Sequence, residues 1–416
     1  MAGLLLAVAA AAGPQIPLEE YRGRRQALRA SLGESSLILF GRTEKEADDS
    51  RDGFFQEPNF HYLTGWREPG AILVLFPSGR QPGEMLLVPR RSERRDRWTG
   101  RKAAPDDPDI LRVTGFEAVE PAESFEMLLP KVLEAAPKLA TLLDHPAAAK
   151  LRALAPLREF TEAAPLIARQ RMKKSAAELA LIERAVEATA DAHEAAWKRT
   201  APGLSERQIG AVLIGAWMDR GCQRSAYPPI VGSGPGGVTL HYFDNSRRMD
   251  GGDLLLMDAG AECDGYAADI TRTVPVSGRF TPRQRELYEI VLGAHKAALA
   301  AVRPGATLAR TGGNSIYRVA LAYLDSHGKD RAGNPLGKYF THGIGHHIGL
   351  DVHDAHDPAV PLEAGMVVTI EPGLYIPEEG IGIRIEDMVL VTETGGRVLS
   401  ARLPTEPEAI ERALRR

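Results

Sequence analysis

Histidine is concentrated in one short part of this chain. Five of its eleven histidines lie between His342 and His356, in the glycine-punctuated segment HGIGHHIGLDVHDAH. A His-rich surface loop and a polar cluster under a sheet are two ordinary explanations. A third is a metal site with proton-handling neighbours, because imidazole is a common metal ligand and titrates near neutral pH. The choice depends on whether other segments supply partner ligands.

Two acidic residues flank a predicted hairpin turn. Asp258 ends the apolar strand DLLLMDAG, Asp269 follows in YAADITRTV, and Asp264-Gly265 between them is a strong hairpin signal. A turn at these two residues places Asp258 opposite Thr271, with Asp269 on the same side one pleat away. A turn shifted back by one residue places Asp258 and Asp269 directly opposite each other. Either register puts both acids on one face, where like charges repel unless a cation lies between them.

The C-terminal part contains a second pair of acids. Glu371 closes the apolar strand MVVTI before a Pro-Gly turn, and in GIGIRIEDMVLV the isoleucines occupy one face while Arg384 and Glu386 occupy the other. A solvent-facing polar side would explain Arg384 and Glu386 taken alone. Four carboxylates in otherwise apolar strands are harder to explain that way, because burying them unpaired is costly.

Charge balance indicates what could hold these acids together. Two divalent cations would balance the four carboxylates and leave room for a bound hydroxide. His346 is the best candidate for a nitrogen ligand, because the glycines that flank it let the backbone approach closely. An oxygen-rich site with one imidazole suits Mn²⁺, with Co²⁺, Zn²⁺ or Fe²⁺ as competitors. The sequence therefore predicts a site for two divalent metal ions.

Two domains are expected to position these residues, because 416 residues exceed one ordinary core. The predicted division is a possible leader at residues 1–15, an N-terminal domain at residues 16–168 and a catalytic domain at residues 169–416. Strands and helices do not alternate strictly, which favours an α+β fold over a doubly wound parallel sheet.

The N-terminal domain is predicted to be α/β. A basic amphipathic helix ends at Gly33. Apolar runs bounded by turn residues then indicate strands at residues 35–41, 59–66, 71–79 and 84–90. Short helices and loops are expected between residues 120 and 160.

The catalytic domain is predicted to begin with two capped helices. Ser175 and Glu178 form a capping box, and Ser205 and Gln208 form another. Hairpin-like strands are expected at residues 254–276 and 366–391, and helices at residues 282–301 and 306–326.

Composition narrows the function classes. The formal net charge of −4 gives no reason to expect a nucleic-acid partner. No segment is long and apolar enough to span a membrane. The N-terminus MAGLLLAVAAAAG resembles a secretory signal that lacks its basic n-region, which favours an exported or periplasmic protein over the cytoplasmic alternative. Cys222 and Cys263 show no paired spacing and predict neither a disulfide framework nor a cysteine metal site.

In order and spacing, several segments resemble the pita-bread metallopeptidases that cleave next to proline. They are LHYFDN, MDAGAECDGYAADITRTVPVSGRFT, HGIGHHIGLDVHD, TIEPGLY and GIRIEDMVLVT. Within that family the chain most resembles Xaa-Pro aminopeptidase (aminopeptidase P), with Xaa-Pro dipeptidase (prolidase) a near relative. The resemblance implies an N-terminal ribonuclease-H-like α/β domain followed by a pita-bread catalytic domain of two α+β halves. It also implies a dinuclear centre, usually of manganese.

The resemblance also implies a role for each candidate residue. The metal ligands would be Asp258, Asp269, His346, Glu371 and Glu386, with Asp269 and Glu386 bridging the two ions. His353 would stabilise the tetrahedral intermediate or handle protons, and Arg384 would support the ligands through hydrogen bonds. The residues that line the substrate cleft would be His241, His342, His353, Tyr375 and Tyr227.

The predicted reaction is hydrolysis of the bond between an N-terminal residue and a following proline. That amide has no N–H, so it suits a site that needs only the carbonyl group. A hydroxide bridging two metals would attack the carbonyl carbon while a metal polarises its oxygen. Glu371 would carry a proton toward the prolyl nitrogen.

Alternatives to this assignment stay open. Aminopeptidase and prolidase share every ligand, so the motifs do not separate them. An inactive peptide-binding pita-bread module is disfavoured because all five ligand types are present. Trp98 resembles a tryptophan that reaches a neighbour's active site in oligomeric relatives, which predicts a homo-oligomer (dimer or tetramer). A half-buried domain aromatic is the alternative for that side chain.

Overall fold

The computed structural model describes residues 15–45 and 53–415, so residues 1–14 of the predicted leader lie outside the described residues. The chain divides into two compact units, Met1–Gln170 and Arg171–Arg416, close to the predicted division after residue 168. Within the described ranges, no helix combines the length and apolar character needed to cross a membrane.

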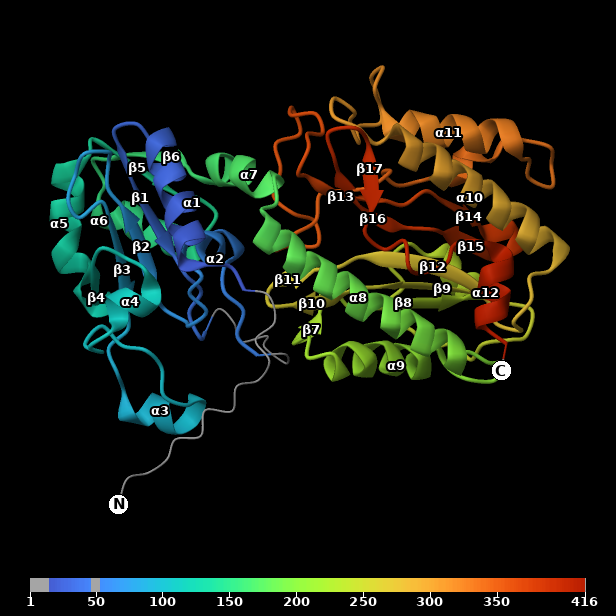
Figure 1. The fold of residues 1–416 in the computed structure, drawn as a ribbon, viewed down its shortest axis with the longest axis horizontal. Helices are drawn as coiled ribbons and strands as arrows, with labels where there is room; N and C mark the ends of the chain where they lie inside the picture. Colours follow the sequence, from blue (N-terminus) through green and yellow to red (C-terminus); the bar gives the residue numbers. More distant parts are fainter. Residues whose placement is uncertain (1–14, 46–52, 416) are drawn as a thin grey trace. The chain divides into compact units, whose positions relative to one another are not determined.

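The first unit is built on a six-stranded sheet with the order β4-β3-β2-β1-β5-β6 (Figure 1). The β1–β2 and β2–β3 pairs are antiparallel, and the other three pairs are parallel. The strands are β1 (Ser35–Phe40), β2 (Ile72–Leu75), β3 (Glu84–Val88), β4 (Val119–Pro121), β5 (Lys138–Thr141) and β6 (Glu159–Glu162). The helices are α1 (Leu18–Ser31), α2 (Pro58–Thr64), α3 (Glu93–Thr99), α4 (Ile110–Thr114), the 3₁₀ turn η1 (Ala122–Ser124), α5 (Phe125–Ala135), α6 (Pro146–Leu154) and α7 (Ala164–Met172), which runs into the second unit.

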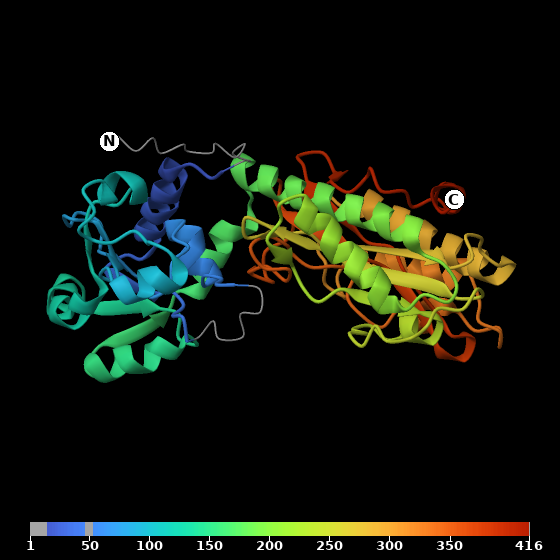
Figure 2. The same ribbon diagram turned by 90° about the horizontal axis from the view of Figure 1, so that it is seen from below.

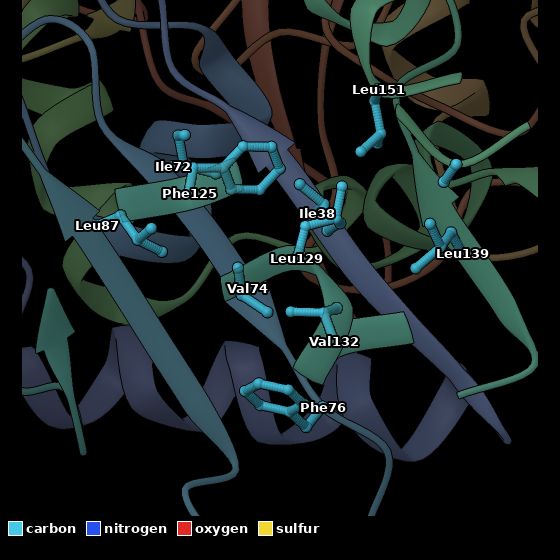
Figure 3. Close-up of a cluster of buried hydrophobic side chains, with 11 residues drawn as sticks. Ile38, Ile72, Val74, Phe76, Leu87, Phe125, Leu129, Val132, Leu139 and Leu151 are labelled. Atoms are coloured by element: carbon cyan, nitrogen blue, oxygen red, sulfur yellow. The ribbon is translucent and has the colours of Figure 1, made fainter. Parts of the chain in front are cut away.

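The core of this unit lies between the sheet and the helices α5 and α6. Ile38, Val74 and Leu87 project from three neighbouring strands toward Phe125 and Leu129 of α5 (Figure 3). Burial of these side chains supplies the main favourable contribution to folding of the unit.

Helix α1 is joined to the sheet by a buried ion pair. Arg25 donates to both carboxylate oxygens of Glu84 at 2.7 and 2.8 Å, and both side chains are almost fully buried. The basic face predicted for this helix is therefore partly internal, because a paired arginine can be buried where an unpaired one cannot.

One prediction for this unit is wrong and a second is incomplete. The strand predicted at residues 59–66 is absent, since residues 58–64 form helix α2: Pro58 opens the helix, Glu57 caps it and Gly65 ends it in a left-handed conformation. Between residues 120 and 160 the predicted short helices are present as α5 and α6, but the prediction missed β5, which lies beside β1, and β6, which lies beside β5. Such short segments become strands because they pair with a strand that is distant in sequence. Their own composition does not reveal that pairing.

The second unit places helices over small sheets. Its strands are β7 (Arg224–Ser225), β8 (Ile230–Ser233), β9 (Leu254–Ala259), β10 (Ala261–Cys263), β11 (Tyr266–Ala267), β12 (Ile270–Pro275), β13 (Val367–Ile370), β14 (Gly373–Ile376), β15 (Ile381–Arg384), β16 (Asp387–Val391) and β17 (Gly396–Val398). Its helices are α8 (Ala176–Arg199), α9 (Glu206–Asp219), α10 (Pro282–Ala301), α11 (Ile316–His327) and α12 (Pro407–Ala413), with 3₁₀ turns η2 (Gly234–Val238), η3 (Leu336–Tyr339) and η4 (Pro377–Glu379).

Each of the two hairpins is in contact with at least one helix of a pair. Helices α8 and α9 lie next to each other and contact strands between β7 and β12 (Figure 1, Figure 2). Helices α10 and α11 form the second pair, and α10 contacts β13, β14 and β15. The predicted α+β arrangement is therefore confirmed, and each acid-bearing hairpin has its own helical support.

Most helix boundaries in this unit agree with the sequence. Both predicted capping boxes are present, at Ser175 and at Ser205. The exception is the helix predicted from residue 306, since α11 begins only at Ile316. Gly312 and Gly313 precede it, and the side chain of Ser315 caps its first turn.

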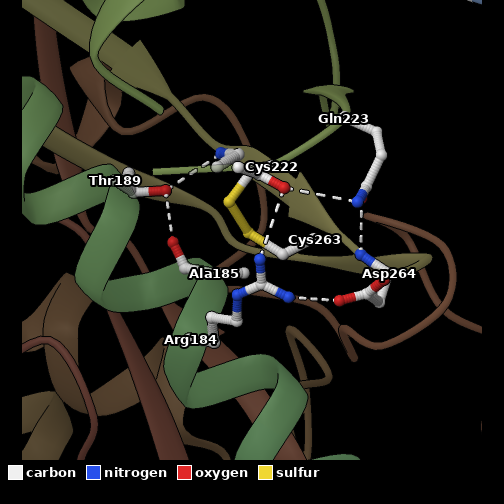
Figure 4. Close-up of a disulfide and its surroundings, with 9 residues drawn as sticks. Arg184, Ala185, Thr189, Cys222, Gln223, Cys263 and Asp264 are labelled. Carbon is white, nitrogen blue, oxygen red and sulfur yellow. Dashed lines mark hydrogen bonds and ion pairs between the residues drawn. A yellow bond between two sulfur atoms is a disulfide. The ribbon is translucent and has the colours of Figure 1, made fainter. Parts of the chain in front are cut away.

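A disulfide joins Cys222 to Cys263, contrary to the prediction that the cysteines are unpaired (Figure 4). Cys222 follows α9, whereas Cys263 ends β10. Strand β7, which begins two residues after Cys222, pairs with β10 and so brings Cys222 next to Cys263, although the sequence separation is 41. Sequence spacing could not reveal this pair because the sheet brings it together.

Candidate active site

The first hairpin has one of the two registers predicted for it. Thr271 is paired with Asp258 in the β9–β12 ladder, and Cys263 is paired with Tyr266. Asp264 and Gly265 form the turn with φ values of 53° and 90°, which is the left-handed pair that a type I′ hairpin turn requires. The register with Asp258 and Asp269 directly opposite is therefore excluded.

Asp269 lies where this ladder is interrupted, between β11 and β12. Across the hairpin is Gly260, where a Cβ would lie 1.7 Å from the carbonyl oxygen of Ala268. Only glycine fits at that position, and the close backbone approach lets Asp269 project toward the same space as Asp258. The hydroxyl of Tyr227 contacts both carboxylates and lies 2.5 Å from Asp269 Oδ1.

The second hairpin brings Glu371 and Glu386 together. Ile370 pairs with Asp387 and Gly373 pairs with Arg384. The same register therefore places Glu371 opposite Glu386, at the point where both strands are interrupted. The backbone N–H of Glu386 donates to the carbonyl of Thr271 at 3.1 Å, which ties this hairpin to the first.

His346 is held by the strand that precedes Glu371. Its carbonyl accepts from the N–H of Thr369 at 2.9 Å, and its N–H donates to Thr369 Oγ1 at 3.1 Å. A Cβ on Gly345 would lie 1.9 Å from the carbonyl oxygen of Thr369, so the predicted need for glycine beside this histidine is met. Nδ1 of His346 lies 3.1 Å from the carbonyl oxygen of His347, which leaves Nε2 as the free lone pair.

The structure brings all five predicted ligands to one cavity of about 760 Å³. His346 Nε2 lies 3.4 Å from Asp269 Oδ2 and 3.6 Å from Glu371 Oε1. Ligand atoms of Asp269, His346 and Glu386 all lie within 4.8 Å of one another. Hard oxygen donors and one imidazole that converge in this way suit a divalent cation.

Burial sets the electrostatics of these acids. It raises the pKa of Asp258 to about 6 and that of Glu371 to about 7, although Arg384 opposes the first shift and His346 the second. It also raises the pKa of Glu386 well above its usual range, and the charges of Asp269 and Glu371 add to that shift. The protein's own cations therefore do not neutralise the cluster, which is the electrostatic condition that a bound metal would satisfy.

Arg384 connects the two hairpins through hydrogen bonds next to the four acids. It donates to Asp258 Oδ2 at 2.5 Å, to the hydroxyl of Tyr375 at 2.6 Å and to Thr271 Oγ1 at 3.0 Å. Thr271 in turn donates to Glu386 Oε2 at 2.6 Å. The predicted solvent-exposed alternative for Arg384 and Glu386 is excluded, because both side chains are buried.

Four of the other predicted residues, His241, His342, His353 and Tyr227, line the same cavity. Tyr375 does not line it, because its ring is buried against Ile230 and Leu256 and only its hydroxyl reaches His342 and Arg384. His342 Nε2 lies 2.9 Å from the hydroxyl of Tyr375, and its Nδ1 lies 3.6 Å from Glu371 Oε2. The ring of His353 lies edge-on to that of His346, with centroids 4.2 Å apart. His241 lines the opposite part of the cavity and stacks on Phe243 at 5.8 Å.

Sequence reasoning missed Phe243, Thr369 and the role of Thr271. Phe243 lies within the motif LHYFDN and is 51% exposed. The alternation of side chains along that segment could have indicated an apolar residue beside His241. Thr271 could have been identified from the hairpin register, since it is the partner of Asp258.

Comparison with known proteins now decides the family. Residues 180–393 match metallopeptidase family M24, and residues 21–141 match the aminopeptidase P N-terminal domain. The chain belongs to metallopeptidase family M24. This membership confirms the predicted family and its dependence on a metal.

Relatives within family M24 match along nearly the whole chain. An Xaa-Pro aminopeptidase of Escherichia coli is 36% identical over 95% of this chain and 98% of its own length. Xaa-Pro aminopeptidase 3 of Mus musculus is 35% identical over 96% of this chain and 86% of its own length. The structure of E. coli aminopeptidase P with the inhibitor Pro-Leu superposes with a TM-score of 0.86 at 32% identity, covering 96% of this chain and 98% of that one. These M24 structures confirm the predicted two-domain fold.

One buried histidine behind the site gives a pH-dependent prediction. His193 of α8 donates from Nε2 to the carbonyl of Ile270, next to Asp269, at 3.1 Å. Burial and the charge of Arg272 lower the pKa of His193 to about 3. Because the unfolded chain protonates this imidazole near pH 6.5, its neutral form stabilises the fold fully above that pH and progressively less as the pH falls toward 3.

We therefore compare the free energy of unfolding of the wild type with that of His193→Gln at each pH. The difference between the two proteins should fall by about 2 kcal/mol between pH 7.5 and pH 5. Urea unfolding of both proteins measures it. The difference between the two proteins is used because the buried acids also make stability depend on pH. Their pKa values are raised, so their effect on stability is opposite in sign to that of His193, but it is the same in both proteins and cancels. A difference that stays constant over this range would contradict a neutral His193.

Proposed function

We propose that the chain is a metal-dependent Xaa-Pro aminopeptidase, which removes the N-terminal residue of peptides whose second residue is proline. The observation that carries this proposal is the convergence of two aspartates, two glutamates and His346 on one cavity. The M24 family and the Xaa-Pro aminopeptidases among its relatives support the reaction class.

The metal centre is proposed to hold two divalent cations, with Mn²⁺ as the first choice and Co²⁺ or Zn²⁺ as alternatives. Asp258, Asp269, His346, Glu371 and Glu386 would hold them. The donor set fits, since it is rich in carboxylate oxygen and contains no thiolate, which favours hard cations. Divalent ions at this place supply Lewis-acid chemistry, namely activation of a water nucleophile and polarisation of the scissile carbonyl.

The protein's own groups are arranged to handle the substrate and its protons. Glu371 Oε2 points toward His342, one of the residues proposed to line the substrate cleft, so a proton held on this carboxylate faces the substrate and can be passed to the prolyl nitrogen. His353 stands beside His346 on the open side of the cavity, where its imidazole can donate to the oxygen of the attacked carbonyl. Tyr227 and Arg384 hold Asp258 and Asp269 in place from behind.

Prolidase is the competing assignment, because a dipeptidase would use the same ligands. A cavity of about 760 Å³ leaves room beyond an Xaa-Pro unit, which favours acceptance of longer peptides. An inactive peptide-binding module is disfavoured by the buried, intact ligand set.

A substrate panel tests the function. We expect the Mn²⁺-loaded protein to hydrolyse Ala-Pro-Gly and longer Xaa-Pro peptides, to leave Ala-Ala-Gly intact, and to lose activity after chelation until Mn²⁺ is restored. Turnover confined to Xaa-Pro dipeptides would assign the chain as a prolidase. Absence of all turnover in fully metal-loaded protein would favour the binding module.

Export remains part of the proposal. The Cys222–Cys263 disulfide supports it, because structural disulfides persist mainly in oxidising compartments such as the periplasm. The mass of the mature N-terminus decides whether the leader has been removed, and cytoplasmic fractionation of the full-length chain would count against export.

Self-association as a dimer or tetramer is proposed on the basis of α3. Trp98 is 82% exposed on this helix, and none of the residues of α3 is buried. Large exposed aromatic side chains are enriched at protein interfaces. Sedimentation of the wild type and of Trp98→Ala tests whether this side chain contributes to assembly.

A further inference from the structure

His353 is positioned by its backbone. Its side chain forms no hydrogen bond with any residue in the described ranges, and its one ring contact is with His346 at 4.2 Å. An imidazole that has to meet a reacting carbonyl needs a fixed place. The question is therefore which groups fix the loop that carries it.

Two acidic residues lie close to His353 in sequence: Asp354 follows it directly and is absent from the cavity lining, whereas Asp351 lies two positions before it and lines the cavity edge. Asp351 Oδ2 accepts from Arg171 at 2.7 Å, and Asp354 also accepts from Arg171. Asp354 Oδ2 accepts from Lys174 at 2.7 Å. Lys174 in addition donates to the carbonyl of Arg171 at 2.6 Å, so the two cations form one unit at the start of the catalytic domain.

Three of the four charged side chains in this network are buried, and the fourth, Asp351, is 43% exposed. The side chains of Lys174 and Asp354 are each 1% exposed, and that of Arg171 is 2% exposed. Two positive groups face two carboxylates. Although burial opposes it, the two cations hold the pKa of Asp354 at about 2, so this carboxylate is charged at every working pH.

The loop closes tightly on this network. The N–H of Asp354 donates to the carbonyl of His347 at 2.8 Å, next to the metal ligand His346. Gly349 packs against the ion pair, since a Cβ there would lie 2.5 Å from Asp354 Oδ2 and 2.9 Å from Lys174 Cε. The anchor of the loop is therefore rigid at both ends of the segment between His347 and Asp354.

We propose that Arg171 and Lys174 are positioning residues for catalysis: through Asp354 they fix the backbone of His353, so that its imidazole lies beside His346. This inference rests on the proposed aminopeptidase function. It gives a function to the basic segment RQRMKKS, which runs from the end of α7 to Ser175, the N-cap of α8.

The test uses Lys174→Met and Asp354→Asn in the full-length Mn²⁺-loaded protein. Loss of a group that supports an active-site residue from behind lowers activity by about 10- to 100-fold. We expect kcat for Ala-Pro-Gly to fall by that factor, while KM and bound metal change less than about twofold. Lys173→Met is the matched control, because the neighbouring Lys173 is 55% exposed and pairs with the surface residue Glu363. Its kcat should equal that of the wild type.

A double-mutant cycle with His353→Ala separates positioning from general damage. If Lys174 acts through His353, adding Lys174→Met to His353→Ala should lower kcat no further. Asp354→Asn, which keeps the shape of the side chain, gives the same comparison if Lys174→Met does not fold. Additive losses in kcat would overturn the inference.

A second readout does not depend on activity. In metal-free protein labelled at histidine, the ring ¹H–¹⁵N signal of His353, assigned with His353→Ala, should broaden or shift in Lys174→Met and stay unchanged in Lys173→Met. An unchanged His353 signal in Lys174→Met would overturn the inference. Failure of the wild type to cleave Ala-Pro-Gly would instead contradict the proposed function, and the ring signal would still decide the positioning role.

Discussion

Glu386→Gln is expected to abolish peptide hydrolysis while leaving the metal-free fold intact. Glu386 is buried and lies opposite Glu371, and Asp269, His346 and Glu386 are the ligand atoms that converge most closely. In the proposed metal centre Glu386 is shared by the two ions, so removal of its charge would weaken the binding of both. Since metal chemistry contributes several kcal/mol of transition-state stabilisation, kcat/KM should fall on the order of 10³-fold or more.

The thermal stability of Glu386→Gln is expected to differ from that of the wild type mainly when metal is present. Burial raises the pKa of Glu386 far above its usual range, so the metal-free protein already favours the neutral form that glutamine imitates. The thermal midpoint of metal-free Glu386→Gln should therefore equal or exceed that of the metal-free wild type. The rise in midpoint on adding Mn²⁺ should be largely lost, because ligand binding no longer stabilises the folded state.

Glu378→Gln serves as the control, because this side chain is exposed on η4 and lies outside the cavity. Calorimetry with and without Mn²⁺, together with the peptide assay, measures both effects. Near-normal turnover in Glu386→Gln would contradict its place as a metal ligand.

Loss of the disulfide is expected to produce the largest change in stability. The bond closes a loop with a sequence separation of 41 residues. For a loop of that length, the restriction of the unfolded chain corresponds to about 4 kcal/mol. Cys222→Ala combined with Cys263→Ala should therefore lower the free energy of unfolding by about that amount in urea titrations.

Reduction of the wild type supplies the matched comparison. Dithiothreitol should destabilise the wild type by a similar amount and leave the double alanine variant unchanged. The segment just after β7 carries Tyr227, whose hydroxyl contacts Asp258 and Asp269. We therefore also expect weaker metal binding in the variant. Equal stability of the oxidised and reduced wild type would show that the bond contributes nothing.

The convergence of the candidate ligands could be predicted in part because the signals around them are local. Side chains alternate along a strand, and Asp264-Gly265 accepts the positive φ values of a tight turn, so the acids of the first hairpin had to share a face. Ser175 and Ser205 marked helix starts for the same reason, since a cap is formed by residues a few positions apart.

Features that depend on distant pairing could not be predicted in this way. The Cys222–Cys263 bond exists because β7 lies beside β10, and β5 is a strand because it lies beside β1. The contact between Lys174 and Asp354, which lies next to His353, joins residues that are separated by 180 positions in sequence. The error at residues 59–66 is different, because the end signals around α2 were local but were outweighed in the prediction by aromatic composition.

Position 271 illustrates how narrow the choice of residue can become inside such a site. A β-branched side chain suits this position in the buried strand β12, and the site also uses a hydroxyl that donates a hydrogen bond to Glu386 and accepts one from Arg384. Valine meets the first demand and serine the second. Threonine alone among the genetically encoded amino acids combines a β-branched side chain with a hydroxyl, so it is the residue that best fits this position.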